Sequence, residues 1–456
     1  MDEMSSKREQ DVVVEAERND SSPAALVIGG GIAGIQAALD IADAGFKVYL
    51  VEREPSIGGR MAQLDKTFPT LDCSSCILTP KMVDVGRHPN IELLTYSEVV
   101  DFQGQVGDFH VKVKKKPRYV HEELCTGCGL CAEACVWKKI PSEFDAGVAM
   151  RSAAYIPFPQ AVPLKAVIDE KTCLYLTRGK CGRKCEQACD AGAIDFEMRE
   201  ELLDLQVAAI IVATGFDPFD PHIKPELGYS YPNVITALEF ERLSSASGPT
   251  AGKITLNGKE PKDVVFIQCV GSRDQTVGHE YCSRICCMYT AKEAHLVKER
   301  IPEANVTIFY MDVRAFGKGY EEFYDRVRRE GAMYRRGSVS EIYKRGDRVV
   351  VRAEDTLLGE PLEMEADLVV LAVGVVPRAD VEDVAGLLNL ERSPDGFFAE
   401  AHPKMRPVDT TRDGIYLAGC CQGPKDIPDT VAQAKAAASS AIVILRQEQA
   451  KLKQES

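Results

Sequence analysis

The sequence predicts an α/β fold with two dinucleotide-binding halves and a cysteine-rich segment inserted into the first half. Three observations predict it. An apolar strand, a glycine-rich turn and a helix occur near the start of the chain, and a second apolar strand at residues 263–267 precedes another helix. Between them, residues 125–189 carry eight of the 16 cysteines. The 456 residues are enough for two or three domains with their own cores.

The first half opens with a complete βαβ unit. Residues 24–28 indicate a buried strand, residues 35–44 a helix, and residues 46–51 a second strand that ends at Glu52. Glycines let the backbone approach a pyrophosphate, the helix N-terminus stabilises its charge, and Glu52 can accept hydrogen bonds from ribose hydroxyls. The alternative is a glycine-rich turn in another kind of α/β domain. The glycines that fit G-x-G-x-x-G are Gly29, Gly31 and Gly34.

Three further segments favour FAD over NAD. Gly58-Gly59-Arg60 resembles the loop after the acidic residue in two-domain flavoproteins, residues 208–215 resemble their "ATG" strand and turn, and residues 414–419 resemble their late strand. In that pattern an Asp follows the last glycine, whereas Cys420 follows it here, which predicts a thiol near the flavin. The predicted contacts in these segments are Gly59, Arg60, Thr214, Gly215, Gly419 and Cys420.

The cysteine-rich insertion indicates two [4Fe–4S] clusters. Its first run is C-x2-C-x2-C-x3-C, the bacterial ferredoxin spacing, and its second run is C-x7-C-x3-C-x3-C. Residues 193–196, after the second run, resemble the strand that follows a ferredoxin cluster. In two-cluster ferredoxins the fourth cysteine of one run binds the other cluster. A structural zinc site is the alternative. The predicted ligands are Cys125, Cys128, Cys131 and Cys189 for one cluster, and Cys173, Cys181, Cys185 and Cys135 for the other.

The second half lacks the glycines of a nicotinamide site. After the strand at residues 263–267, the bulky side chains of Gln268 and Val270 would crowd a pyrophosphate. Four cysteines stand there instead, one at the strand's carboxyl end and three around the start of the helix at residues 285–300. They predict a third [4Fe–4S] cluster; the alternative is buried cysteines in a packed helix. These cysteines are Cys269, Cys282, Cys286 and Cys287.

The chain resembles the A subunit of heterodisulfide reductase, from methanogens and anaerobic bacteria. The matching stretches span most of residues 24–440: Gly58–Thr70, Asp72–Leu78, Pro141–Pro163, Tyr281–Ala291, Arg314–Glu321 and Ala418–Ala432. The resemblance implies thioredoxin-reductase-like halves with FAD, ferredoxin clusters in the insertion, and an atypical cluster at the Cys269 group.

The same resemblance implies a role in a larger complex. Its flavin would split electron pairs from a hydrogenase or dehydrogenase partner, sending one electron to ferredoxin and the other to a disulfide-reducing subunit. Full-length members carry an N-terminal cluster domain and a C-terminal ferredoxin domain, and because this sequence shows neither pattern we expect a short form. The alternatives are a stand-alone NAD(P)H-dependent FAD/iron–sulfur oxidoreductase and a non-redox scaffold.

The domain order follows from these motifs. We expect a flexible tail at 1–22, an FAD-binding domain built from 23–117, 201–260 and 377–445, an inserted ferredoxin-like domain at 118–200, a second Rossmann-like domain at 261–376, and a tail at 446–456.

Composition excludes some classes of protein. The net charge of −14 argues against nucleic acid as a partner. The sequence has neither an apolar run long enough to span a membrane nor a signal-peptide pattern, so we expect a cytoplasmic protein.

Weaker candidates remain open. Cys73 and Cys76 form C-x-x-C, which fits a flavin-adjacent dithiol, half of a metal site, or inert cysteines. Cys420 and Cys421 tune the flavin or are simply buried. Lys318 meets a charged group near the flavin or lies on an exposed loop. We expect no catalytic residues beyond the flavin other than Cys73, Cys76 and Lys318.

Overall fold

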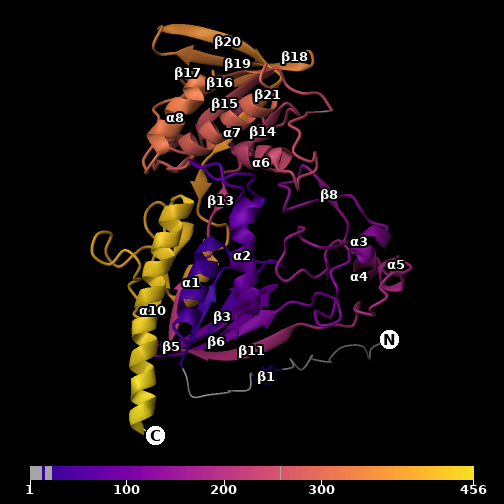
Figure 1. Cartoon of the computed structure of the whole chain (residues 1–456), viewed down its shortest axis with the longest axis vertical. Helices are drawn as coiled ribbons and strands as arrows, with labels where there is room; N and C mark the ends of the chain where they lie inside the picture. Colours follow the sequence, from indigo (N-terminus) through magenta and orange to yellow (C-terminus); the bar gives the residue numbers. More distant parts are fainter. Residues whose placement is uncertain (1–12, 16–22, 257, 456) are drawn as a thin grey trace, which may run out of the picture.

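The computed structural model describes residues 13–15, 23–256 and 258–455. Two sheets, each covered by helices, lie one above the other, and a segment of short elements projects from the side (Figure 1). Residues 1–22, expected to be a flexible tail, lie outside the described part except for Val13–Glu15, which form strand β1 beside β11. No helix in the described ranges is long and apolar enough to cross a membrane.

The first half contains a five-stranded parallel sheet of order β23-β12-β2-β3-β4. Helices α1, α2 and α10 bury their apolar side chains against one face, and a second sheet of order β1-β11-β6-β5 packs on the other face. The bounds are β2 Ala24–Ile28, β3 Lys47–Glu52, β4 Ile91–Thr95, β12 Ala209–Val212, β23 Ile415–Leu417, α1 Ile32–Asp43, α2 Ser74–Arg87, α10 Ile427–Glu455, β5 Ser97–Gln105, β6 Asp108–Lys115 and β11 Glu201–Val207.

Helix α1 begins three residues before the expected start because small residues let it approach the sheet. Gly31 is its N-cap. A Cβ on Gly34 would lie only 1.8 Å from the carbonyl oxygen of Gly29, so glycine is required where the helix passes the turn. Apart from Ile32, which is half-buried, the apolar side chains of α1 are fully or almost fully buried in the first core.

The second half repeats the design with a parallel sheet of order β14-β21-β15-β16-β17. Helices α6, α7 and α8 cover one face, and the antiparallel ribbon β18-β19-β20 packs on the other. The bounds are β14 Val234–Thr236, β15 Asp263–Val270, β16 Asn305–Tyr310, β17 Met333–Arg336, β21 Leu368–Val373, α6 Ala237–Ser244, α7 Cys286–Arg300, α8 Tyr320–Arg329, β18 Val339–Arg345, β19 Arg348–Asp355 and β20 Glu360–Ala366.

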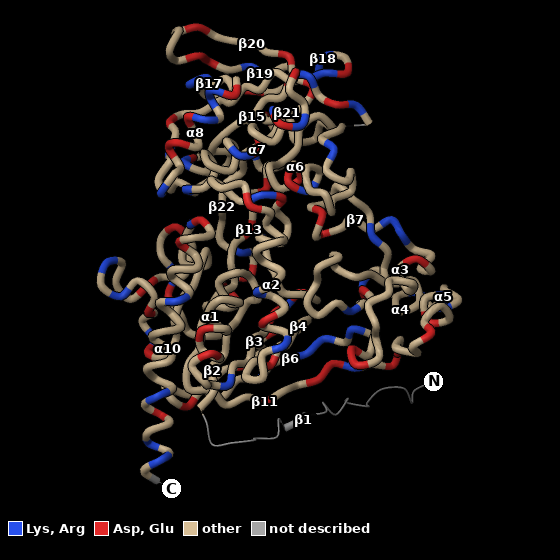
Figure 2. The backbone as a smooth tube through the Cα atoms, viewed as in Figure 1, with Lys and Arg blue, Asp and Glu red and all other residues tan. Residues whose placement is uncertain are grey.

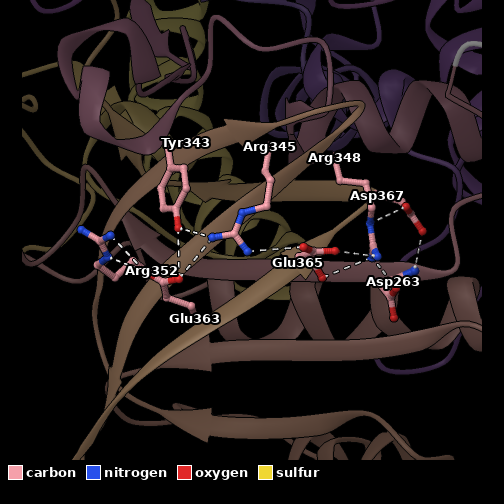
Figure 3. Close-up of polar contacts among 8 residues, drawn as sticks. All are labelled: Asp263, Tyr343, Arg345, Arg348, Arg352, Glu363, Glu365 and Asp367. Atoms are coloured by element: carbon pink, nitrogen blue, oxygen red, sulfur yellow. Dashed lines mark hydrogen bonds and ion pairs between the residues drawn. The ribbon is translucent and has the colours of Figure 1, made fainter.

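A ladder of ion pairs runs along the ribbon (Figure 3). Arg348 pairs with Glu365 at 3.2 Å and with Asp367 at 3.0 Å, and it also contacts Asp263 at the start of β15. Arg352 and Glu363 pair at 2.9 Å farther along. Because these side chains are largely solvated, each pair contributes about 0–1 kcal/mol. The ladder therefore adds little to the stability of the ribbon and is not a candidate site.

The inserted segment consists of short elements around a core rich in cysteine. The strand expected at residues 193–196 is absent; Ile194 makes only an isolated bridge with Val120. Strands β13 and β22 pair where the chain passes between the two halves. The remaining bounds are α3 Leu130–Ala134, β7 Ile140–Pro141, β8 Met150–Arg151, β9 Ala154–Tyr155, β10 Val167–Ile168, α4 Leu174–Arg178, α5 Lys184–Gln187, β13 Asp217–Pro218, β22 Val375–Val376 and α9 Val381–Leu388.

Candidate functional site

A cavity of about 1470 Å³ lies between the two halves. Its lining begins at the glycine turn after β2 and reaches the first turns of α7. It exceeds the ~300–1,000 Å³ of most small-molecule pockets, as an extended dinucleotide requires. The inserted segment supplies part of the wall, including Tyr155 and Phe158.

The glycine turn leaves room at one position and none at the others. A Cβ on Gly29 would lie 2.4 Å from the carbonyl oxygen of Ala213, whereas a Cβ on Gly31 would meet nothing within 4 Å. Gly31 lines the cavity, and the first turn of α1 carries no acidic side chain. The turn therefore offers an open, electropositive cradle that fits a pyrophosphate.

Glu52 closes β3 at the cavity wall, as the sequence predicts. Its Oε2 accepts a hydrogen bond from the Gly30 backbone N–H at 2.6 Å, and its Oε1 accepts one from the Glu54 backbone N–H at 2.8 Å. Burial raises the pKa of Glu52 to about 7, against the lowering effect of these two hydrogen bonds. The carboxyl group is thus held rigidly beside the glycine turn.

The other predicted flavin contacts gather at the same cavity with one exception. Gly59, Arg60, Thr214, Gly215 and Cys420 line it. Arg60 pairs with Asp217 at 3.0 Å, which fixes the guanidinium at the wall. Gly419 is buried behind the lining and donates its N–H to Gln433 Oε1 at 2.8 Å.

A buried ionic cluster at the far end was not found from the sequence. Lys292 of α7 donates hydrogen bonds to Glu241 of α6 and, at 3.0 Å, to the carbonyl oxygen of Lys66. Glu293 hydrogen-bonds to Glu241; burial and then the Glu241 charge raise the pKa of Glu293 well above its usual value. Lys292, Glu241 and Glu293 line the cavity and are at most 3% exposed. In the sequence these three residues look like the charged residues of ordinary solvent-exposed helix faces. No sequence pattern therefore marks them as buried.

A second buried lysine lies behind the late strand. Lys425 donates to the carbonyl oxygens of Gly419 at 2.7 Å and Gly423 at 2.6 Å, and it lines the cavity. Burial lowers the pKa of Lys425. It therefore fixes the turn that carries Cys420, a role the sequence did not reveal.

The structure brings the inserted cysteines together in the two predicted groups. Burial and then the thiols of Cys125, Cys128 and Cys189 raise the pKa of Cys131 to about 11. Burial and then the thiols of Cys135, Cys173 and Cys181 raise the pKa of Cys185 to about 12. Each buried thiol thus has as neighbours the three partners that the ferredoxin spacing assigns to it.

The surroundings of these groups fit sulfur-bound iron. Backbone N–H groups point at two sulfurs, from Ala166 to Cys125 at 3.5 Å and from Ala193 to Cys189 at 3.4 Å, as donors that stabilise cluster thiolates do. Across the described residues, no three His, Cys, Asp or Glu side chains are spaced to hold a single metal ion. A [4Fe–4S] cluster sets its ligands farther apart, because each bonds to a different iron.

The Cys269 group also comes together, beside the cavity. Burial and then the thiols of Cys269, Cys287 and Cys282 raise the pKa of Cys286 well above its usual value. Gln268 is buried, and its Nε2 has no hydrogen-bond partner although its Oε1 lies 3.5 Å from Cys287 Sγ. An unpaired buried donor next to four thiols fits a bound group that accepts hydrogen bonds. Within this group Cys269 adopts φ +61°, a conformation uncommon for a non-glycine residue.

Three weaker candidates lie outside the cavity lining. Cys73 and Cys76 form a disulfide at the start of α2, with Cα atoms 5.2 Å apart. Lys318 stands on an exposed loop before α8. Cys421 is buried beneath Cys420, where its thiol contacts the carbonyl oxygen of Val212 at 3.1 Å. Of the four predicted thiols outside the clusters, only Cys420 borders the cavity.

Family models match the chain along most of its length. Residues 25–70 match the FAD dependent oxidoreductase model, residues 118–135 the 4Fe-4S binding domain, and residues 166–441 the pyridine nucleotide-disulphide oxidoreductase model. Thioredoxin reductases of Lactococcus lactis and T. acidophilum have similar structures, with TM-scores of 0.52 and 0.51. They share 14% and 15% identity with this chain, over 93% of it and 99% and 98% of their own chains, so they support the fold alone.

Two curated proteins with similar sequences narrow the class of protein further. The A subunit of the H(2):CoB-CoM heterodisulfide,ferredoxin reductase of Methanothermobacter marburgensis is 55% identical over 94% of this chain and 65% of its own length. The iron–sulfur A subunit of the CoB–CoM heterodisulfide reductase of Methanocaldococcus jannaschii is 55% identical over 97% of this chain and 67% of its own length. The chain thus spans about two thirds of the length of these relatives.

The fold, the cavity and the matching models define an oxidoreductase that binds FAD and an iron–sulfur cluster. The chain belongs to the heterodisulfide reductase A-subunit family. Both the fold class and the resemblance predicted from the sequence are confirmed.

Proposed function

We propose that this flavin- and iron–sulfur electron-transfer subunit carries FAD in the cavity and three [4Fe–4S] clusters around it. One observation carries the proposal: the cysteine-bearing insertion is itself part of the cavity wall. Its residue Val162 accepts a hydrogen bond from the Ile57 backbone N–H at 3.0 Å, next to the flavin loop. On the opposite side, Tyr289 lines the cavity and hydrogen-bonds to Cys286. A bound flavin would therefore lie between thiol groups on two sides.

In this proposal the glycine turn binds the pyrophosphate, Glu52 the ribose, and the loops at Arg60, Thr214 and Cys420 the rest of the cofactor. FAD, when bound, connects two-electron donors to one-electron carriers. The chain's own residues bind and orient it and exclude water. Burial and the Glu241 charge raise the pKa of Glu293 well above its usual value, which favours a proton on this carboxyl group at the end of the cavity, and Lys292 holds Glu241 in place beside it.

We further propose that the chain works in a complex. Names of its relatives include hydrogen, formate, ferredoxin and the CoB–CoM heterodisulfide. A hydrogenase or dehydrogenase would then deliver electrons, and ferredoxin and a disulfide-reducing subunit would receive them, with electron-pair splitting at the flavin. Direct reduction by NADH is disfavoured because buried Gln268 occupies the turn where a pyrophosphate would bind.

The number of clusters can be measured directly. We expect about twelve irons per FAD in anaerobically purified protein, four for each group of thiols. Cys286→Ala should remove about four irons, because it takes one ligand from the Cys269 group. Cys421→Ala is the matched control, since Cys421 is buried outside all three groups, and it should remove none. About eight irons in the unaltered protein would mean that the Cys269 group holds no cluster.

The site of the pyrophosphate can be tested at Gly31. Gly31→Ala should weaken FAD binding at least about ten-fold, because the methyl group would occupy space that the phosphate needs. The fold should be unaffected, since the position is open and its backbone (φ −75°, ψ −178°) suits alanine. Flavin fluorescence during titration of the cofactor-free protein measures the affinity. Unchanged affinity would mean that the pyrophosphate binds elsewhere.

A further inference from the structure

A group of basic residues lies next to the cysteines of the second thiol group in the sequence. Residues 136–139 and 174–185 contain six Lys or Arg and no Asp or Glu, in a chain whose net charge is −14. All six side chains are exposed, and Arg183 alone among them forms a described ion pair, with Glu186 at 3.3 Å. We call this set the basic rim: Lys138, Lys139, Arg178, Lys180, Arg183 and Lys184.

Two exposed apolar side chains directly precede Lys138 of the basic rim. Val136 is 53% exposed, and Trp137, the single tryptophan of the chain, is 37% exposed. Both line one small hollow together with Cys135, Cys173 and Cys181. An exposed tryptophan beside a hollow and within a charged rim has the composition of a protein-docking surface.

The position of this surface favours docking. The insertion projects from the side of the molecule, with α3, α4 and α5 at its tip, away from both sheets (Figures 1 and 2). Since Cys135 and Cys181 are only partly buried, a protein seated on Trp137 would come close to the group that they belong to. Short separation is what electron exchange between proteins requires.

We propose that Val136, Trp137 and the basic rim form the docking surface for an acidic electron-carrier protein. This inference rests on the proposed function, because it takes the Cys135, Cys173, Cys181 and Cys185 group to be a cluster. A cluster bound there would exchange one electron with the iron centre of the docked protein, one being oxidised and the other reduced, with no bond made or broken. The remainder of the chain is acidic and repels the same partner, so the rim also selects where it docks.

Charge reversal in the rim tests the proposal by binding. The probe is a fluorescently labelled acidic two-cluster ferredoxin, titrated against the iron-loaded chain and followed by anisotropy. The triple variant Lys139→Glu, Arg178→Glu, Lys180→Glu should weaken binding at least about ten-fold at low ionic strength. The difference should shrink at about 0.3 M salt, where screening is strong. Trp137→Ala should weaken binding at both salt concentrations.

The matched control carries the same change of net charge elsewhere. Lys344→Glu, Lys404→Glu and Lys453→Glu alter three exposed lysines outside the insertion, and this variant should bind the probe within about two-fold of the unaltered chain. Equal weakening in both triple variants would overturn the proposal, because net charge alone would then explain binding. So would rim-dependent binding of a labelled oligonucleotide with no binding of the ferredoxin.

Iron content separates this inference from the function on which it rests. Rim-dependent binding to a chain that lacks iron at the second group would support the docking surface while overturning its cluster. If the iron content were full but the affinity for the ferredoxin did not depend on the rim, the proposed function would stand and the docking surface would be overturned.

Discussion

Replacing Lys292 with methionine is expected to lower the free energy of unfolding by about 3–5 kcal/mol at pH 8. The Lys292 ammonium is 1% exposed and is the cation that faces the carboxyl groups of Glu241 and Glu293. Without it, one buried carboxylate has no counter-charge, and leaving a buried charge unpaired is among the most destabilising single changes.

The loss should depend on pH in a defined direction. The pKa of Glu293 is raised by burial, so its contribution to stability is present at low pH and is lost as the pH rises through the folded-state pKa. The Lys292 charge lowers the pKa of Glu293, so without it Glu293 holds its proton more readily, and the destabilisation should be smaller at pH 5 than at pH 8. Urea denaturation at both pH values measures this.

Two companion variants test the cause of that loss. Lys292→Met combined with Glu241→Gln should recover most of the stability, because it removes the unpaired charge. Lys344→Met, at an exposed lysine, should change stability by no more than about 0.5 kcal/mol. If the free energy of unfolding fell by less than about 1 kcal/mol, and equally at both pH values, water would have to reach these buried charges and screen them.

Gly34→Ala is expected to abolish flavin binding and to destabilise the first half by about 3 kcal/mol or more. Its Cβ would lie 1.8 Å from the carbonyl oxygen of Gly29, so α1 would have to move away from the turn. That movement would separate the helix N-terminus from the phosphate it is proposed to bind. Absorbance of the purified protein and its thermal midpoint measure the two effects.

Gly31→Ala is the control for that result, because the two substitutions add the same methyl group three residues apart. It should weaken binding without loss of stability, since the space around Gly31 is open. If Gly34→Ala kept its flavin and its thermal midpoint, the close approach of α1 to the turn would not be needed for the site.

The sequence predicted the parts of the site that depend on local spacing. Strand β2 has the predicted bounds, and the partners of Cys131 and Cys185 follow from the ferredoxin repeat. Spacing alone could not reveal Lys292 and Glu241, which lie 51 residues apart and meet only because α6 and α7 pack side by side. Lys425 was not predicted for a different reason: its partners are backbone carbonyl oxygens of the preceding turn, which no pattern of side chains marks.

The start of α1 and the missing strand near Ile194 have other causes. The helix begins earlier than expected because Gly34 allows α1 to pass the carbonyl oxygen of Gly29 at a distance that any Cβ would prevent. The segment after Cys189 has the apolar residues of a strand, but residue Val120 offers it only one bridging contact. In both places tertiary packing, and not the local sequence pattern, determined the secondary structure.

The strand order β23-β12-β2-β3-β4 has a consequence for biosynthesis. Strand β12 pairs with β2 on one side and with β23, residues Ile415–Leu417, on the other. During translation the nascent chain therefore exposes one apolar edge of this sheet until residues 415–417 have left the ribosome. The cysteine-bearing insertion is complete about 200 residues earlier. We expect iron–sulfur loading to begin on a chain that cannot yet retain its flavin.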